Sequence, residues 1–442
     1  MPSTATLADL STSADVAAEP LTLTTTEQFL LGCDCGRGEL VIRVRMHLTG
    51  QPDRPCLREA WELAVARHRL FRCVLAWDEA ARLPCWEPID SPPPLRFTGE
   101  PDVAWPQLDL LQSPGLRASV ATDEPDVTTI DIDFHHAVCD GQGARQFLLD
   151  WFAAYTALLA DGQPRLVRLE PERLLTRGTI VNPPGVHPPG LAEGFGNLWA
   201  TVRGRTVRLP TDGQPGRFES LRLGEDRTEQ VRRAMREARC TANDLGIALT
   251  LAGLEELRPS SRLLGPLRRW HTVANPVDLR KPSDRRLPAC NRIGFAFVRR
   301  RTGRVSFADL LASVQTQMRY VKDGYIGAEF IRGLDLVQPG GWVERFRRMG
   351  WFVPTAQFTC LGDTTRGTRH GFVRDDRGAL LFGSMRLDGI SGFAPCGPAV
   401  PVSIGQCETA SEMTFTVVTR GYPTEPVLAA IDRQLTAFTR RR

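Results

Sequence analysis

Residues 162–216 lack the periodicity of a helix or a strand, and they divide the chain into two parts that have it. The stretch is dense in Gly and Pro, for example in NPPGVHPP and LPTDGQPG, and such clusters mark turns and loops. A connection of this length without secondary structure is uncommon inside one compact domain. We therefore predict an N-terminal half at 21–175 and a C-terminal half at 217–442, joined by a crossover loop at 176–216 and preceded by a flexible arm at 1–20.

Strand and helix patterns are mixed in both parts of the chain. ELVIRVRMHL at 39–48 alternates in polarity, which predicts a half-buried strand. The segment 126–136 alternates in the same way, and an amphipathic helix rich in aromatic residues follows it. In the second part, 413–419 predicts a strand and 425–440 a final helix. Because strands and helices do not alternate strictly, we predict a mixed α+β (α/β) fold in two similar halves.

The composition is that of an ordinary globular protein. Of the 442 residues, 42% are hydrophobic and 24% are charged, which excludes a disordered chain and a coiled-coil rod. The formal net charge of +4 is too small to indicate a nucleic-acid partner, because such proteins concentrate basic charge on one surface. The sequence has no run of about 18 or more apolar residues, so we expect no transmembrane segment.

The cysteines point to a reducing compartment. They number eleven, which is odd, and they show no spacing typical of a disulfide framework. The first residues also lack the basic start and continuous apolar stretch of a secretory signal. Cys33 and Cys35 are closely spaced, but two further zinc ligands at a comparable spacing do not follow. We therefore expect a cytoplasmic protein in which this pair does not bind zinc.

The motif HHAVCDG at 135–141 concentrates groups that can move protons. We expect the preceding strand to continue through both histidines, so that its alternation places His136 on the side of its apolar residues and His135 on the other side. An imidazole that faces an interior or a cleft is suited to act as a general base, because burial tunes its pKa. Asp140 and Gly141 then form a turn before a helix, whose first N–H groups favour nearby negative charge.

Two other interpretations of this motif are open from the residues alone. The histidines can end a strand by chance while Asp140 caps the following helix. A metal ion bound by His135, His136 and Cys139 is the other alternative, although neighbouring strand residues face opposite sides and do not easily share one ion.

In a chain of this length, HHAVCDG resembles the HHxxxDG signature of the superfamily of condensation domains and CoA-dependent acyltransferases. This group includes nonribosomal peptide condensation domains, chloramphenicol acetyltransferases, plant BAHD acyltransferases and mycobacterial polyketide-associated acyltransferases. Other segments resemble the superfamily in order and spacing, including LTLTTTEQFLL, LREAWELAVARHRLFRCVL, CTANDLGIALTLAGL, ANPVDLR and NRIGFAFV. The DFGWG motif of the plant enzymes is absent, which disfavours a plant-type enzyme.

The resemblance implies a fold and a set of site residues. The fold would be two chloramphenicol acetyltransferase-like halves that form a pseudo-dimer with a central tunnel. The second histidine, His136, would be catalytic, while His135 and Asp140 would be structural, with Asp140 paired to Arg280. The backbone N–H of Gly141 would stabilise the oxyanion together with a hydroxyl from the second half, for which the candidates are Thr359 and Ser403.

The expected function follows from this resemblance. The protein would be an acyltransferase that moves an acyl group from acyl-CoA, or from the phosphopantetheine of a carrier protein, to a small-molecule hydroxyl or amine in specialised-metabolite or lipid biosynthesis. No metal and no permanently bound cofactor would be required. The alternatives are a free-standing condensation domain that forms amides or epimerises, and a non-catalytic member that docks in an assembly line.

Overall fold

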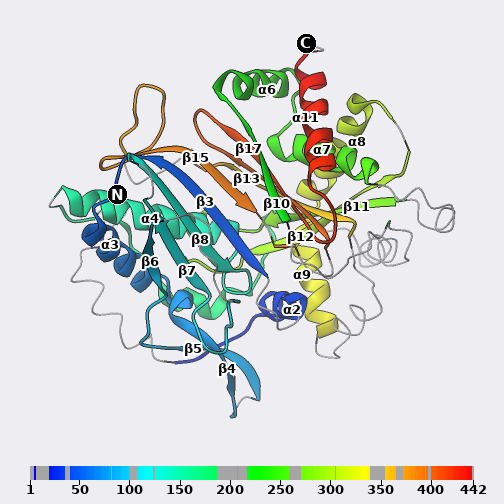
Figure 1. Ribbon diagram of the computed structural model, residues 1–442. Helices are drawn as coiled ribbons and strands as arrows, with labels where there is room; N and C mark the ends of the chain where they lie inside the picture. Colours follow the sequence, from blue (N-terminus) through cyan, green and yellow to red (C-terminus); the bar gives the residue numbers. More distant parts are fainter. Residues whose placement is uncertain are drawn as a thin grey trace.

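Two six-stranded sheets form the frame of the molecule (Figure 1). Helices accompany both sheets, so the mixed α+β fold predicted from the sequence is confirmed. The structure is a computed structural model, and it describes residues 4–5, 19–34, 40–80, 82–99, 107–122, 125–160, 162–164, 166–186, 207, 217–257, 270–303, 305–338, 354–364, 372–393, 395–396 and 400–440. Most of the predicted arm and much of the predicted crossover lie outside these residues.

The first sheet contains the strand that leads into the motif. Its strand order is β14-β15-β3-β8-β7-β6. The apolar side of this sheet shares one hydrophobic core with helices α3 and α4, and β3 buries alternate residues from Ile42 to Leu48 in that core. The element bounds are β3 (Val41–Thr49), α3 (Arg54–Arg67), β6 (Leu95–Thr98), β7 (Leu116–Ala121), β8 (Val127–His135), α4 (Gly141–Leu159), β14 (Leu381–Phe382) and β15 (Met385–Phe393).

The second sheet is formed by the C-terminal part of the chain. Its strand order is β10-β17-β16-β13-β11-β12, and a separate hydrophobic core lies between it and helices α6, α7, α8 and α11. The element bounds are β10 (Arg217–Leu223), α6 (Glu225–Ala238), α7 (Ala242–Glu256), β11 (Trp270–Asp278), β12 (Ile293–Arg301), α8 (Phe307–Asp323), α9 (Ile326–Val337), β13 (Ala356–Asp363), β16 (Val402–Glu408), β17 (Met413–Thr419) and α11 (Glu425–Arg440).

A crossing segment links the two sheets. Strands β14 and β15 lie between β13 and β16 in the sequence, yet β15 pairs with β3 in the first sheet. Figure 1 shows β15 leaving the C-terminal strands to lie beside β3. Each sheet therefore packs against its own hydrophobic core, but the first sheet is incomplete without residues from the second part of the chain.

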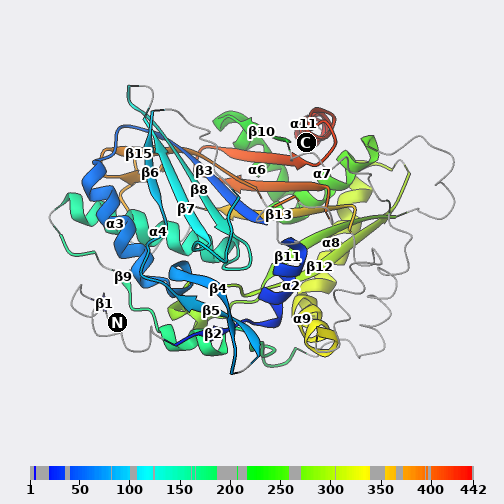
Figure 2. The same ribbon diagram turned by 60° about the horizontal axis from the view of Figure 1, so that its bottom comes forward.

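Smaller elements complete the architecture. Helix α2 (Thr25–Asp34) lies beside α9, and the rings of Phe29 and Phe330 meet edge to face with their centroids 5.6 Å apart. Figure 2 shows this contact, which is a second junction between the two lobes, each lobe being one six-stranded sheet with its helices. Among the described residues, no helix has both the length and the apolar character needed to cross a membrane. The remaining elements are β1 (Thr4–Ala5), β2 (Leu21–Thr22), β4 (Cys73–Asp78), β5 (Leu83–Pro88) and β9 (Leu166–Val167), with 3₁₀ turns at Arg69–Arg72, Pro171–Thr176 and Pro282–Arg286.

Candidate active site

The motif forms the connection between β8 and α4. Strand β8 ends at His135, and the turn closes where the Val138 N–H donates to the His135 carbonyl at 2.9 Å. His136 is thus the first residue of the turn, and the expectation that the strand continues through it is wrong. The backbone sets its place instead, because the His136 N–H donates to the Leu40 carbonyl at 2.8 Å.

The imidazole of His136 is in an environment that favours its neutral form. Burial lowers the pKa of His136 below the ordinary value of 6.5, and nearby backbone groups of His136 and Cys139 and the charge of Asp140 offset this only in part. Its Nδ1 atom is buried and makes no hydrogen bond of good geometry to any described residue. The residue as a whole keeps some exposure to solvent. A neutral, partly accessible imidazole can accept a proton near pH 7.

The ring of His135 makes its contacts inside the protein. Its side chain is almost fully buried, and its Nδ1 accepts a hydrogen bond from the Ala137 N–H at 3.2 Å. Its Nε2 lies 3.9 Å from Oδ1 of Asp34, and that oxygen accepts from the Leu40 N–H at 2.7 Å. His135 therefore stabilises the turn from inside, while His136 stands at the accessible side.

Asp140 joins the motif to three other backbone and side-chain groups. Its Oδ1 accepts from the Gly143 N–H at 2.8 Å and so caps α4. Its Oδ2 accepts from Arg280 Nη1 at 2.9 Å and from the Arg292 N–H at 2.7 Å. Since the side chain is 1% exposed, three donors surround a buried carboxylate. Asp140 and Arg280, which the resemblance paired, are in direct contact.

Arg280 also contacts the segment that contains Arg292. Its Nη2 donates to the Cys290 carbonyl at 2.8 Å. Burial lowers the pKa of Arg280, but the charge of Asp140 and the hydrogen bond to it outweigh this and raise the pKa above its ordinary value. The guanidinium is therefore a permanent cation in this ion pair.

Asn291 is a site residue that the sequence interpretation missed. Its Nδ2 donates to two consecutive carbonyls of the motif, those of His136 and Ala137, each at 2.9 Å. The side chain is 4% exposed, so these bonds are made inside the protein. The segment NRIGFAFV was noticed for its resemblance as a strand, but nothing in a single sequence connects its first residue with the motif. Cys290, Asn291 and Arg292 together cover the motif turn.

Gly141 occupies the first position of α4, so its N–H has no acceptor within the helix. The position is also crowded. A Cβ atom there would lie 2.6 Å from Cδ2 of Leu361 in β13, and side-chain contacts of that length do not occur without displacement. Glycine thus lets the second sheet approach the start of the helix closely.

Thr359 and Ser403 lie on neighbouring strands of the second sheet. Their sequence neighbours Phe358 and Ile404 belong to its hydrophobic core, so Thr359 and Ser403 lie on the opposite face. Thr359 is half-buried and two residues before Leu361, which contacts the Gly141 position. Ser403 is fully buried, and its Oγ accepts from Gln357 Nε2 at 2.9 Å. This arrangement favours Thr359 over Ser403 as a group that can contact a substrate.

The described part of the chain contains no cluster of three or more His, Cys, Asp or Glu side chains arranged to hold a metal ion. Cys139, considered above as a ligand together with the two histidines, is fully buried, and burial raises the pKa of its thiol well above the ordinary value. The pair at Cys33 and Cys35 is described only at its first member.

Comparisons with known proteins give structural matches alone. No family model and no curated protein sequence matches the chain. It is similar in structure to the first condensation domain of the calcium-dependent antibiotic synthetase in complex with a substrate analogue, at 15% identity and a TM-score of 0.68 over 96% of each chain. It is also similar to a starter condensation domain of rhizomide synthetase in complex with C8-CoA, at 13% identity and a TM-score of 0.67 over 97% of each chain. A third match is a trichothecene 15-O-acetyltransferase from Fusarium sporotrichioides, at 14% identity and a TM-score of 0.68 over 94% of each chain.

Proposed function

Because this chain has the two-lobed fold of the superfamily of condensation domains and CoA-dependent acyltransferases, we propose that it is an acyltransferase whose general base is His136. The proposal rests on the different environments of the two histidines in the motif turn. One histidine is buried and bonded within the protein, and its neighbour is partly accessible with a lowered pKa. A turn built only for stability has no need for the second imidazole.

The reaction is the attack of a hydroxyl or amine on an acyl thioester. The acceptor loses its proton to the neutral imidazole of His136 as its oxygen or nitrogen bonds to the thioester carbonyl carbon. The tetrahedral intermediate then collapses, the C–S bond breaks, and the thiolate takes the proton from the imidazolium. Atoms and charge balance without any other reactant.

The negative charge on the intermediate requires hydrogen-bond donors aimed at the oxyanion. The N–H of Gly141 at the start of α4 is one candidate, because it has no acceptor within the helix. The hydroxyl of Thr359 is the second candidate, because it lies on the sheet face that reaches Gly141 through Leu361. Asp140 is excluded as a base since its oxygens already accept three hydrogen bonds.

The donor is proposed to be acyl-CoA or an acyl group on the phosphopantetheine of a carrier protein, and the acceptor a small molecule of the cytoplasm. A complex of a structural neighbour with C8-CoA supports an acyl thioester as the donor. The second candidate function is amide formation as a free-standing condensation domain, which the similarity to the condensation domain of the antibiotic synthetase supports. Both reactions use His136 in the same way and differ in the acceptor.

The test is turnover of a panel of acyl-CoA and acyl-pantetheine thioesters with simple alcohols and amines, followed by mass spectrometry of the acylated product. We expect product with the wild type and loss of at least about a hundredfold in His136→Ala, since general-base catalysis contributes about 10²–10⁴-fold. His47→Ala, on β3 outside the motif, is the matched control and should keep its activity. Full activity in His136→Ala would contradict the role of the imidazole, and a wild type inactive with every thioester would favour a non-catalytic docking protein.

A further inference from the structure

A segment of the C-terminal part, residues 286–292, is inserted into the N-terminal part beside the motif. Its middle residues Ala289 and Cys290 are fully buried and belong to the hydrophobic core of the first sheet, not to that of the second. This inserted segment reaches the motif through Asn291, whose Nδ2 donates to the His136 carbonyl at 2.9 Å. The position of the inserted segment therefore affects the position of the His136 backbone.

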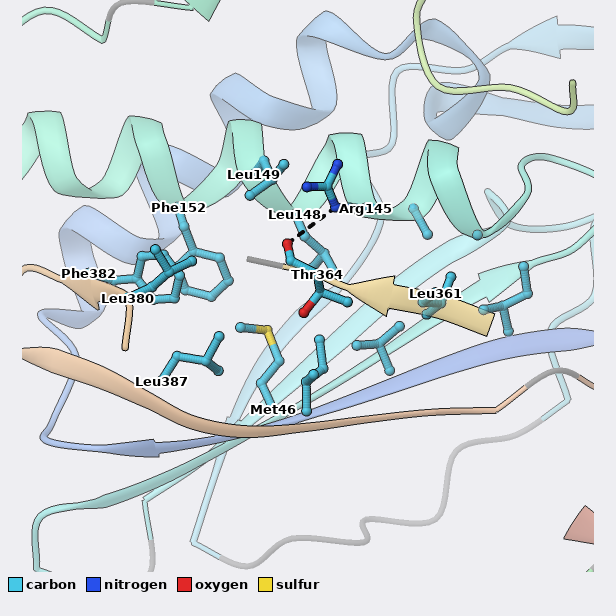
Figure 3. A pocket seen from close by; sticks show the side chains of 15 residues that line it. Met46, Arg145, Leu148, Leu149, Phe152, Leu361, Thr364, Leu380, Phe382 and Leu387 are labelled. Atoms are coloured by element: carbon cyan, nitrogen blue, oxygen red, sulfur yellow. Dashed lines mark hydrogen bonds between the residues drawn. The ribbon is translucent and has the colours of Figure 1, made fainter. Parts of the chain in front are cut away.

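Helix α4 has two faces that contact the C-terminal part of the chain. Figure 3 shows one of them, from which Arg145 and Phe152 point toward β13 and the crossing segment. The other face lies against the inserted segment, where Gln146 Nε2 donates to the Leu287 carbonyl at 3.1 Å. Asp150, one turn after Gln146, lies on this second face. The inserted segment is thus bonded to the same helix that begins at the motif.

His68 contacts the middle of the inserted segment. It directly follows α3, its side chain is fully buried, and its Nδ1 accepts from the Ala289 N–H at 3.0 Å. The rings of Phe71 and Phe147 meet the imidazole edge to face. A buried imidazole costs free energy unless its nitrogens have partners. Because an apolar side chain would fill this space without that cost, stability alone does not account for the histidine.

Asp150 keeps the His68 ring in the state that the bond to Ala289 requires. His68 Nε2 lies 3.3 Å from Asp150 Oδ2, and the same oxygen accepts from Arg67 Nε at 2.9 Å. Burial lowers the pKa of His68 below its ordinary value of 6.5, and Asp150 offsets this only in part. The ring is therefore neutral at pH 7. Its one proton is on Nε2, facing Asp150, which leaves Nδ1 free of a proton and able to accept from the Ala289 N–H.

We propose that His68 is a positioning residue for acyl transfer: through Ala289 it fixes the inserted segment, and through Asn291 this segment fixes the turn that carries His136. The proposal rests on the proposed function and adds to it a residue that touches no substrate, since His68 is fully buried. Ala289 lies 221 positions after His68 in the chain. Loss of their hydrogen bond leaves a buried N–H without an acceptor and lets the inserted segment move, so the effect should appear in kcat and not in KM.

Two substitutions of the same shape separate the hydrogen bond from the packing. His68→Asn places an amide oxygen near the position of Nδ1 and can accept from Ala289, whereas His68→Leu fills the same space without an acceptor. We expect kcat to fall at least about tenfold in His68→Leu at unchanged KM and to stay within about threefold of the wild type in His68→Asn, because a misplacement of about 1 Å costs roughly a hundredfold. His68→Gln, whose longer side chain reaches toward Asp150 instead, should resemble His68→Leu. Equal kcat values in the Asn, Gln and Leu variants would overturn the proposal.

His271→Leu is the matched control for the loss of a buried imidazole. His271 is 2% exposed and its Nε2 lies 3.0 Å from Glu255 Oε2, so it resembles His68 in burial and in its carboxylate partner. It belongs to β11 in the second sheet and has no contact with the inserted segment through its ring. We expect this variant to lose stability at unchanged kcat. A loss of kcat equal to that in His68→Leu would show that any buried imidazole has this effect and would overturn the proposal.

A double-mutant cycle tests whether His68 acts through Asn291. If it does, His68→Leu should lower kcat at least about tenfold in the wild type but less than about twofold in Asn291→Ala, because the inserted segment then no longer fixes the turn. Two losses that simply multiply would show that His68 acts by another route and would overturn the proposal.

Hydrogen exchange separates this proposal from the proposed function, because it requires no substrate. Peptides that cover residues 286–292 and the motif at 135–141 should exchange at least about tenfold faster in His68→Leu than in His68→Asn, since local opening becomes easier. Faster exchange together with a wild type that transfers no acyl group supports the role of His68 in placing the turn and contradicts the proposed function. Equal exchange in the two variants, with acyl transfer at equal kcat, supports the proposed function and overturns the role of His68.

Discussion

Arg280 Nη1 lies 2.9 Å from Asp140 Oδ2, so an ion pair joins the motif to a residue 140 positions later in the chain. The backbone N–H of Arg292 donates to the same oxygen at 2.7 Å. The turn that carries His136 is therefore held by the C-terminal part as well as by its own strand and helix. The geometry of the candidate base depends on the docking of the two lobes.

Removal of either partner of this pair should harm the fold more than the chemistry. In Arg280→Ala the buried carboxylate of Asp140 loses its ion-pair partner, and we expect the free energy of unfolding to fall by about 3–5 kcal/mol. In Asp140→Asn we expect a smaller loss, because Arg280 Nη1 still lies 3.1 Å from Asp278 Oδ1. Urea denaturation followed by tryptophan fluorescence measures this loss. Activity in the remaining folded protein should keep the pH dependence of the wild type, because neither group carries the proton. Wild-type stability and activity in both variants would contradict the structural role of the pair.

The pH dependence of the reaction should report His136. The base must be neutral to accept a proton, and burial lowers its pKa below 6.5. We therefore expect kcat/KM to be constant from about pH 7 downward until the pH approaches that lowered pKa, and to fall about tenfold per pH unit below it. The measurement is a rate profile between pH 4.5 and 8.5. An acidic limb with a midpoint above 6.5 would be inconsistent with this environment of the imidazole.

Thr359 and Ser403 should differ in their effect on the rate. Thr359→Val removes a half-buried hydroxyl at nearly constant shape and should lower kcat by about a hundredfold, the cost of one oxyanion donor. Ser403 already accepts from Gln357, so Ser403→Ala should affect stability more than kcat. Steady-state kinetics and thermal melting of both variants separate these outcomes. A larger loss of kcat in Ser403→Ala than in Thr359→Val would indicate that Ser403, and not Thr359, is the oxyanion donor.

Asn291 should act as a positioning residue for His136. In Asn291→Ala the carbonyls of His136 and Ala137 lose their donor, and the turn can shift; a misplacement of about 1 Å costs roughly a hundredfold in rate. The acidic limb of the pH profile should stay in place, since the imidazole itself is retained. Asn291→Asp has the same shape but turns an acceptor toward the two carbonyls, so it should be no better than Asn291→Ala. Full activity in Asn291→Asp would show that these hydrogen bonds do not matter.

Much of the local structure could be predicted from short-range patterns. The alternation at 39–48 corresponds to β3, the alternation after 126 to β8, and the aromatic stripe after the motif to α4. The final strand and helix also lie where the periodicity put them. These elements follow from the polarity of neighbouring residues, because the period of burial is a property of the segment itself. His136 marks the limit of this reasoning, since the alternation ends one residue before it.

The arrangement around the site depends on contacts between residues far apart in the chain. Asn291 meets the His136 carbonyl, and the β14–β15 segment, which by sequence belongs to the C-terminal half, completes the first sheet. A single sequence carries no signal for such contacts, because any of several polar or apolar residues could satisfy them equally well. The sequence thus specifies the strand, the helix and the histidine pair. The docking of the two parts of the chain decides which donors surround Asp140 and how closely Leu361 approaches Gly141.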